Sequence, residues 1–225
     1  MDGNGKWATA KGLPRIEGHR VGMNGIKQIT DICSKRGIRI LTLYAFSNQN
    51  WNRPHQEVDF LMSRFEKYLD REEEDLKKKK IQLRVIGRKD NLPSSLKERI
   101  ERVTFNTRNN QDFILNLAIS YGGQEEIVDA VKAISFAVKK GTISFSDINK
   151  ELFKRYLYTP DLPYPDLLIR TGGEFRVSNF LLWQIAYTEI WITPICWPGF
   201  NEEHFLEALR DYAGRERKFG RIREV

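Results

Sequence analysis

Apolar residues follow two alternating patterns along the chain. Continuous apolar runs rich in β-branched and aromatic residues predict strands buried on both faces, and these runs lie at 38–46, 81–87, 112–120 and 165–170. Apolar positions spaced three to four residues apart predict helices, which span 21–37, the stretch from Pro54 to the lysine run at 77–80, 92–107, 125–141 and 202–218. This alternation predicts an α/β fold, with one domain over residues 1–225 and a mainly parallel central sheet flanked by helices.

Three polar loops follow predicted strands, and ligands of parallel sheets bind beyond the carboxyl ends of the strands. The loops are AFSNQNWNRP at 45–54, SYGGQ at 120–124 and IRTGGEFRVSNF at 169–180. Two of them contain glycine pairs and two contain arginines. Because the planar guanidinium of arginine fits phosphate oxygens, we expect these loops to gather at one edge and to form a double phosphate site.

Composition narrows the class of protein. At 225 residues and 40% hydrophobic content, the chain is long enough for a sizeable core. It has no apolar stretch of the roughly 20 residues that span a bilayer, and no signal-peptide pattern opens it. The two cysteines are far apart and the three histidines are dispersed, so neither a disulfide framework nor an imidazole metal cluster is expected.

The net charge of +7 and the pI near 9.4 permit anionic partners: nucleic acid, a membrane surface or phosphorylated substrates. The lysines at 77–80 end a predicted helix, where cations favour the helix dipole, so a solvated helix end explains them. A second basic cluster, RERKFGRIR at 215–223, lacks the interleaved aromatic residues of a single-strand binder.

The first seven residues, MDGNGKW, place an acid beside two glycines. Glycine lets a ligand approach the main chain, and successive N–H groups bind anions. An acid repels an anion unless a divalent cation lies between them. The segment is typical of a phosphate bound by main-chain amides and Lys6 with Mg²⁺ next to Asp2, and a Gly-rich turn of a disordered terminus is the alternative.

Several other site classes are excluded or remain open. GNG lacks the full GxGxxG pattern and follows no strand, GxxxxGK[ST] is absent, and no Ser-His-Asp order is evident. His19 is a candidate general base or phosphate contact, with a hydrogen bond at a helix start as the alternative. Trp183 and Tyr187 lie in an apolar run and are expected in the core.

Five stretches together resemble the cis-prenyltransferases, the family of undecaprenyl diphosphate synthase. They are MDGNGKWA, LTLYAFSNQNWNRP, LNLAISYGG, DLLIRTGGEFRVSNFLLWQIAYTEIW and RERKFG. They cover essentially the whole chain in order, and the DDxxD motif of the unrelated trans-prenyltransferases is absent. The resemblance implies an α/β domain with an apolar tunnel, in which an allylic diphosphate loses diphosphate, is attacked by the double bond of isopentenyl diphosphate, and then loses a proton to leave a cis double bond.

The same resemblance implies a role for each matching residue. Asp2 holds Mg²⁺. Ser47 and Asn50 lie where the family places groups near the proton-loss step. These three residues are the implied catalytic residues. Glu189 assists through the metal or through hydrogen bonds. The residues implied to bind the allylic substrate are Gly3, Asn4, Gly5, Lys6, Trp7, Arg15, His19, Trp51 and Arg53. Those implied to bind the diphosphate of isopentenyl diphosphate are Arg170, Arg176 and Ser178.

The chain departs from the family pattern at four places. The family has an apolar strand before the MDGN motif, whereas this sequence starts at Met1. We therefore expect the protein to extend upstream of Met1, where a targeting peptide is one option, and the alternative is a sheet that lacks this strand. Lys6 replaces an arginine and keeps the charge without the planar fork. Gln49 replaces an acid, and IGRKD replaces IGD. These changes affect details of allylic binding.

The fourth departure concerns product length. Arg64 and Lys67 stand where polyprenyl synthases have large apolar residues, and Ile119 stands where they often have a small one. Each buried isoprene unit contributes about 4 kcal/mol at roughly 0.8 kcal/mol per carbon, so a charge or a plug in the tunnel favours a short product of about ten to twenty carbons. An irregular, lavandulyl-type coupling of two dimethylallyl diphosphates is included in this expectation. A long-chain polyprenyl synthase is the alternative, if these side chains face solvent.

Two further classes are weighed against the enzyme. A non-catalytic partner subunit would lack active-site residues, yet Asp2, Asn50, Arg170 and Arg176 are all present. A nucleic-acid binder would bind oligonucleotides with an affinity that depends on the salt concentration and does not depend on Mg²⁺. The resemblance implies a homodimer with at most peripheral membrane contact, in the cytoplasm or, if a targeting peptide precedes Met1, in the plastid stroma.

Overall fold

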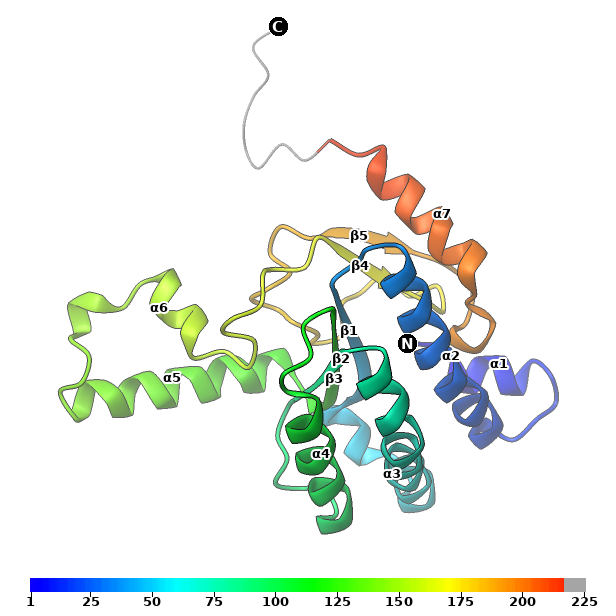
Figure 1. Ribbon diagram of the computed structural model, residues 1–225, viewed down its shortest axis with the longest axis horizontal. Coiled ribbons are helices and arrows are strands. Elements are labelled where there is room, and N and C mark those ends of the chain that lie inside the picture. Colours follow the sequence, from blue (N-terminus) through cyan, green and yellow to red (C-terminus); the bar gives the residue numbers. More distant parts are fainter. Residues whose placement is uncertain (217–225) are drawn as a thin grey trace, which may run out of the picture. The chain divides into compact units, whose positions relative to one another are not determined.

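The computed structural model describes residues 1–216 and divides the chain into two compact units (Figure 1). Unit 1 comprises Met1–Ile32, Tyr164–Arg176 and the described residues from Gln184 onward, and unit 2 comprises Cys33–Pro163 and Val177–Trp183. The basic residues predicted after position 216, and the end of the predicted closing helix, lie outside the described residues. Within those described, no helix is long and apolar enough to span a membrane.

Unit 2 is built on a parallel sheet in the strand order β1-β3-β2. Its elements are β1 (Ile40–Ser47), η1 (Asn48–Asn52), α3 (His55–Lys78), β2 (Ile81–Ile86), α4 (Ser94–Thr107), β3 (Phe113–Tyr121), α5 (Gly123–Lys139), η2 (Phe145–Asp147) and α6 (Lys150–Arg155). The central strand β3 is the apolar core of the sheet, because Leu115, Leu117 and Ile119 are each exposed by 1% or less. The expected parallel α/β arrangement is confirmed here.

The register of the sheet changes at its carboxyl edge. Ile40 of β1 pairs with Ile114 of β3, and the pairing stays regular until Tyr44 faces Ala118. Irregular pairing then accompanies Phe46, directly before the loop that carries the predicted residues 47–53. Such bulges re-aim side chains at strand ends next to functional sites.

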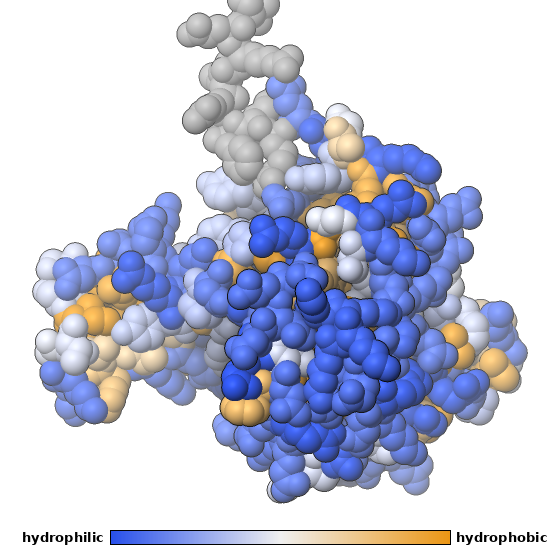
Figure 2. Space-filling model, in the orientation of Figure 1, coloured by the Kyte–Doolittle hydropathy of each residue, from blue (hydrophilic) through white to orange (hydrophobic). Residues whose placement is uncertain are grey.

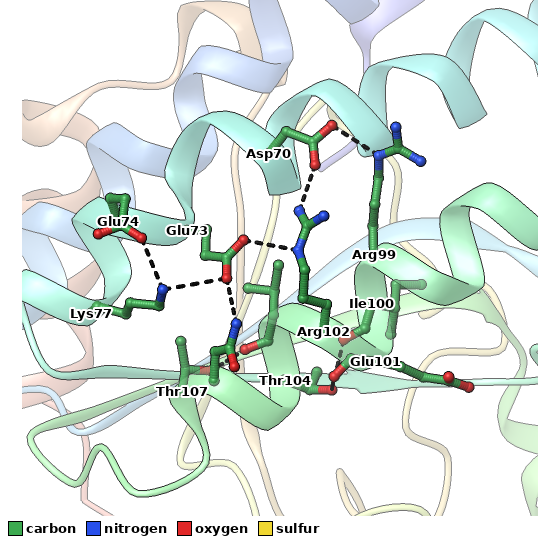
Figure 3. Close-up of polar contacts among 12 residues, drawn as sticks. Asp70, Glu73, Glu74, Lys77, Arg99, Ile100, Glu101, Arg102, Thr104 and Thr107 are labelled. Carbon is green, nitrogen blue, oxygen red and sulfur yellow. Dashed lines mark hydrogen bonds and ion pairs between the residues drawn. The ribbon is translucent and has the colours of Figure 1, made fainter.

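Helices α3 and α4 lie side by side in unit 2 and are joined by an ion-pair network (Figure 3). Asp70 accepts hydrogen bonds from Arg99 Nε at 2.8 Å and from Arg102 Nη2 at 2.6 Å, and Glu73 accepts from Arg102 Nε at 3.1 Å and from Asn106 at 2.7 Å. Because these groups are partly exposed, the network fixes the helix pairing more than it adds stability.

The buried stripe of α3 contains Val58, Leu61, Met62, Phe65, Tyr68, Leu69, Glu72 and Leu76. Lys67 is exposed and, two residues from Phe65, lies on the side of the helix opposite this stripe. Arg64 is half-buried, with its guanidinium 4.7 Å from the ring centroid of Phe60. The interpretation that Lys67 lines an apolar path is therefore wrong, whereas Ile119 is buried as expected.

Unit 1 contains a second parallel pair of strands. Its elements are α1 (Asn4–Thr9), most of α2 (Arg15–Lys35), β4 (Leu167–Arg170), β5 (Glu189–Ile192), η3 (Trp197–Gly199) and α7 (Glu202–Ala213). β4 pairs with β5, from Leu167 opposite Glu189 to Arg170 opposite Ile192. The prediction of Tyr187 as a core residue is wrong because this residue is 75% exposed, at a turn before β5.

Candidate active site

The main chain of Asp2 is fixed by residues from the other end of the sequence. Asp2 N donates to Thr171 Oγ1 at 2.9 Å, and Thr171 Oγ1 donates to Asp2 O at 2.9 Å. Trp197 N also donates to Asp2 O at 2.9 Å. Thr171 is 2% exposed, so these bonds are shielded from water and hold the loop in one position.

The glycines of MDGNGKW allow two close approaches. Gly3 has a φ of 91°, and a Cβ there would lie 2.7 Å from Cys196 Sγ, so a side chain is excluded by conformation and by space. A Cβ on Gly5 would lie 2.7 Å from the guanidinium carbon of Arg15. The second glycine thus lets Arg15, an expected diphosphate ligand, lie directly over the main chain of α1.

A stripe of glycines on α2 receives this loop. A Cβ on Gly18 would lie 1.9 Å from Asn4 O, and one on Gly22 would lie 2.2 Å from Asn4 Oδ1. Gly25 faces the Trp197 ring, and Trp197 Nε1 donates to Gly22 O at 2.7 Å. This stripe was not predicted, although glycines at i, i+4 and i+7 lie on one helix face and are its signal.

The carboxylate of Asp2 is held by a cation and an amide. Arg170 Nη2 donates to Asp2 Oδ2 at 2.8 Å, and Gly3 N donates to Asp2 Oδ1 at 2.7 Å. Burial acts to raise the pKa of Asp2, but the Arg170 and Gly3 hydrogen bonds outweigh it, so the pKa lies below its ordinary value. Asp2 is consequently a carboxylate at neutral pH, and 45% of its side chain remains exposed.

Glu174 links two of the predicted cations. It pairs with Lys6 and accepts a hydrogen bond from Arg176 Nη1 at 2.7 Å, and the Lys6 ammonium also lies 3.4 Å from Gly172 O. Arg170 Nη1 donates to the carbonyl oxygen of Arg176. Lys6, Arg170 and Arg176 therefore belong to one polar cluster with Asp2 and Glu174. Sequence reasoning missed Glu174, which has no signal beyond its place between TGG and Arg176.

In unit 2, the loop after β1 orders three predicted residues. Ser47 N donates to Asn50 Oδ1 at 2.9 Å within a capping box of η1. Trp51 Nε1 donates to Ser120 Oγ at 2.9 Å, which fixes the indole at the end of β3. The structure thus brings Ser47, Asn50 and Trp51 together at the carboxyl edge of the sheet, as predicted.

Two more predicted ligands of unit 2 already have partners. Arg53 Nη1 donates to Glu57 Oε1 at 2.9 Å, across the start of α3. Ser178 has a φ of 48°, in the left-handed region that serine rarely adopts, and its carbonyl oxygen lies 3.5 Å from the Tyr44 hydroxyl.

The remaining predicted residues of unit 1 lie as follows. His19 and Trp7 are half-buried, on α2 and α1, and the Lys11 ammonium lies 4.6 Å from the Trp7 ring centroid. Glu189 Oε2 accepts from Arg215 Nη1 at 3.0 Å, so its carboxylate is occupied by an ion pair.

Comparison with known proteins identifies the family. Residues 1–220 match the family described as "Putative undecaprenyl diphosphate synthase". The isoprenyl transferase of Heliobacterium mobile is 45% identical over 99% of this chain and 86% of that protein. The ditrans,polycis-undecaprenyl-diphosphate synthase ((2E,6E)-farnesyl-diphosphate specific) of Legionella pneumophila is 45% identical over 99% of this chain and 93% of that protein.

The chain belongs to the undecaprenyl diphosphate synthase family. It is therefore a cis-prenyltransferase, as the resemblance implied. A lavandulyl diphosphate synthase from Lavandula x intermedia, solved in complex with dimethylallyl diphosphate, is 40% identical, with a TM-score of 0.95 over 98% of this chain and 95% of that one. A probable undecaprenyl diphosphate synthase from Campylobacter jejuni is 33% identical, with a TM-score of 0.79 over 90% of this chain and 93% of that one.

The donor set of this cis-prenyltransferase suits a hard divalent metal ion. Asp2 is ionised and partly exposed, and Mg²⁺ is usually bound by one or two carboxylates together with waters and substrate phosphates. Within residues 1–216, no group of three or more His, Cys, Asp or Glu side chains is arranged to hold a metal ion. Asp2 would hold such an ion together with waters and substrate phosphates.

Proposed function

We propose that this cis-prenyltransferase condenses an allylic prenyl diphosphate with isopentenyl or dimethylallyl diphosphate and releases a short-chain prenyl diphosphate. The observation that carries the proposal is the Asp2–Arg170 pair, with Lys6 and Arg176 joined to the same cluster through Glu174. Such a group of cations, beside an ionised and partly exposed Asp2, suits diphosphates that arrive with a metal ion.

The allylic diphosphate is assigned to the loop at the start of α1. Its expected ligands, carried over from the family, are the main chain of Gly3–Lys6 and the side chains of Lys6, Arg15, His19 and Arg53, with Trp7 and Trp51 against the substrate. The packing of Arg15 over Gly5 supports this assignment. Mg²⁺ bound at Asp2 would neutralise the diphosphate as it departs.

The second diphosphate is assigned to Arg170, Arg176 and Ser178. Two of these are arginines, whose N–H groups form charge-assisted hydrogen bonds with phosphate oxygens. In the structure their guanidinium groups are held by Asp2 and Glu174, so the incoming diphosphate replaces internal carboxylate partners. Glu189 is proposed to assist this site, and the ion pair with Arg215 would then orient the Glu189 carboxylate.

The reaction breaks the allylic C–O bond and a C–H bond, and it forms a C–C bond and a new double bond. The allylic C–O bond breaks with its electron pair on the diphosphate, the acceptor double bond attacks the allylic carbon, and a proton leaves the resulting cation. Asn50 and Ser47 are assigned to the proton-loss step. The hydrogen bond from Ser47 N to Asn50 Oδ1 supports this by fixing the amide orientation.

A diphosphate-release assay tests the activity. Purified protein with Mg²⁺, an allylic donor and isopentenyl diphosphate is expected to release diphosphate, and EDTA is expected to abolish the release. A protein that releases none with dimethylallyl, geranyl or farnesyl donors would instead fit a non-catalytic partner subunit.

The product is proposed to be a short-chain prenyl diphosphate, formed by regular or by lavandulyl-type coupling. Its support is the buried Ile119 and the similarity to the lavandulyl diphosphate synthase; Lys67 no longer contributes. The relative from Legionella pneumophila is named as an undecaprenyl synthase and favours the long-chain alternative. Mass spectrometry of products from the three donors decides between them, and Ile119→Ala is expected to lengthen the product by at least one isoprene unit.

A homodimer is also proposed. Apolar side chains are exposed on α5 and the segment after it (Figure 2): Val128, Val131, Phe136, Phe145 and Ile148. Exposed apolar groups of this kind suit a protein interface. Light scattering on a sizing column is expected to give twice the chain mass, and Phe136→Asp is expected to shift it toward one chain mass. A cytoplasmic or stromal location remains a prediction, and cell fractionation is the measurement that tests it.

A further inference from the structure

Glu125 joins two loops of unit 2 through one carboxylate. It lies in the first turn of α5, and its Oε1 accepts from Asn48 Nδ2 at 3.0 Å. Its Oε2 accepts from Asn179 Nδ2 at 2.9 Å. Asn48 and Asn179 are 131 positions apart in sequence, so the carboxylate is a direct link between segments with no local connection.

Each loop carries residues that the proposed function uses. Asn48 lies in η1 between Ser47 and Asn50, the residues assigned to proton loss. Asn179 directly follows Ser178, which is assigned to the second diphosphate. A hydrogen bond that fixes Asn48 or Asn179 therefore also limits the position of the neighbouring side chains.

Asn179 is held at three points by the start of α5. Its carbonyl oxygen accepts from Gly123 N at 2.7 Å, its Oδ1 accepts from Gln124 N at 2.8 Å, and its Nδ2 donates to Glu125. Asn179 and Ser178 both have left-handed φ angles, of 62° and 48°. This conformation persists only where surrounding contacts impose it, and the contacts come from α5.

The ionised carboxylate of Glu125 suits the two amide donors, Asn48 and Asn179. Burial acts to raise its pKa, but the hydrogen bonds from Asn179, from its own main chain and from Asn48 outweigh burial and hold the pKa below its ordinary value. A carboxylate is acceptor-only, with an oxygen for each asparagine amide.

The first glycine of SYGGQ makes room for this link. A Cβ on Gly122 would lie 2.0 Å from Glu125 Oε2 and 2.8 Å from Asn179 Nδ2. A Cβ on Gly123 would lie 2.8 Å from Leu182 Cγ. The two glycines thus let Glu125 and Leu182 pack closely against the main chain.

We infer that Glu125 is a positioning residue that sets the proton-loss loop and the Ser178 loop in a fixed relation, and this inference rests on the proposed function. Removing it would allow each loop to shift, and a displacement of about 1 Å at reacting groups costs up to about a hundredfold in rate. Glu125 itself need not touch substrate.

Steady-state kinetics of the full chain test the inference. Glu125→Ala is expected to lower kcat and to raise the KM of the acceptor diphosphate, each by about tenfold. Asn48→Ala is expected to lower mainly kcat. Asn179→Gly, which keeps the left-handed backbone accessible, is expected to raise mainly the acceptor KM. Glu101→Ala, which removes an exposed acid of α4, is the matched control and should leave both constants unchanged.

Two readouts separate positioning from a general structural effect. Glu125→Gln should restore both constants to within about threefold of the original, because its amide oxygen accepts from Asn179 and its amide nitrogen can donate to Asn48 after that side chain turns. The Asn48→Ala/Glu125→Ala double variant should have the kcat of Glu125→Ala alone, since Glu125→Ala has already broken the Asn48–Glu125 bond. Thermal melts establish that each variant is folded.

The results that overturn the inference are distinct from those that overturn the proposed function. If the original protein is active and Glu125→Ala stays within twofold of it, Glu125 has no positioning role. The same conclusion follows if Glu125→Gln loses as much as Glu125→Ala, or if the Asn48 and Glu125 effects multiply. If the original protein releases no diphosphate with any donor, the proposed function fails and the inference fails with it.

Discussion

Arg170 donates from Nη2 to Asp2 Oδ2 at 2.8 Å while its Nη1 donates to the carbonyl oxygen of Arg176. One guanidinium therefore joins the acid assigned to the metal and a loop assigned to the second diphosphate. Its side chain is only 12% exposed, so the geometry is shielded and held by packing. The metal assignment of Asp2 and the diphosphate assignment of Arg170 can each be tested by substituting one residue.

Asp2→Asn should reduce turnover by about two to four orders of magnitude, because the neutral amide loses the charge that suits a divalent ion. The amide oxygen can still accept from Gly3 N, so the fold should persist. The check is diphosphate release across a range of Mg²⁺ concentrations, with circular dichroism as the fold control. Turnover within threefold of the original at all concentrations would reject the metal role of Asp2.

The stability contributed by Asp2 should depend on pH. Its pKa in the folded protein lies below the ordinary value of 3.8, so the contribution is present above that value and is lost as the pH falls through the folded pKa. The melting temperature of the original protein should exceed that of Asp2→Asn at neutral pH, and the margin should shrink as the pH is lowered below 3.8. A margin that grows on acidification has the opposite sign and would contradict the assignment.

Arg170→Ala should raise the KM of the acceptor diphosphate by about ten- to a hundredfold and change the KM of the allylic donor far less, given the energy of a charge-assisted hydrogen bond. Arg170→Lys should recover only part of the loss, since one ammonium cannot reproduce both bonds of the fork. Arg20→Ala, which removes an exposed arginine paired with Glu17, is the control. Equal effects on both substrates would show that the two diphosphate sites are misassigned.

Gly18→Ala should destabilise the protein and impair activity together, because its Cβ would lie 1.9 Å from the main-chain oxygen of Asn4 and would displace the start of α1. A main-chain atom cannot move aside as cheaply as a side-chain end. Thermal melts and kinetics measure both effects, and Gly214→Ala, where the nearest atom is 3.6 Å away, is the control. If the two variants behave alike, the glycine stripe does not position the loop.

The sequence predicted the elements with strong periodicity and missed the weak ones. The strand expected at 38–46 is Ile40–Ser47, and the helix expected at 125–141 is Gly123–Lys139. Strand β5 was missed because it has only four residues, and one of them, Ile190, is 42% exposed. The closing helix ends at Ala213, just before Gly214, and the basic residues after it gave no stop signal.

The candidate site was predictable as a set of residues but not as a set of contacts. The family motifs name Asp2 and Arg170, yet 168 positions separate them, and no pattern in the sequence states that they share a hydrogen bond. Thr171 and Glu174 were missed because a hydroxyl and an acid in a polar loop look like ordinary surface residues. Their roles depend on where the chain returns after β4, which is a property of the folded state.

The bonds from Thr171 and Trp197 to the main chain of Asp2 have a consequence for biosynthesis. The main chain of Asp2 acquires these partners only after position 197 has left the ribosome. During elongation the loop at Asp2 therefore lacks these three bonds until the chain has been made to that point.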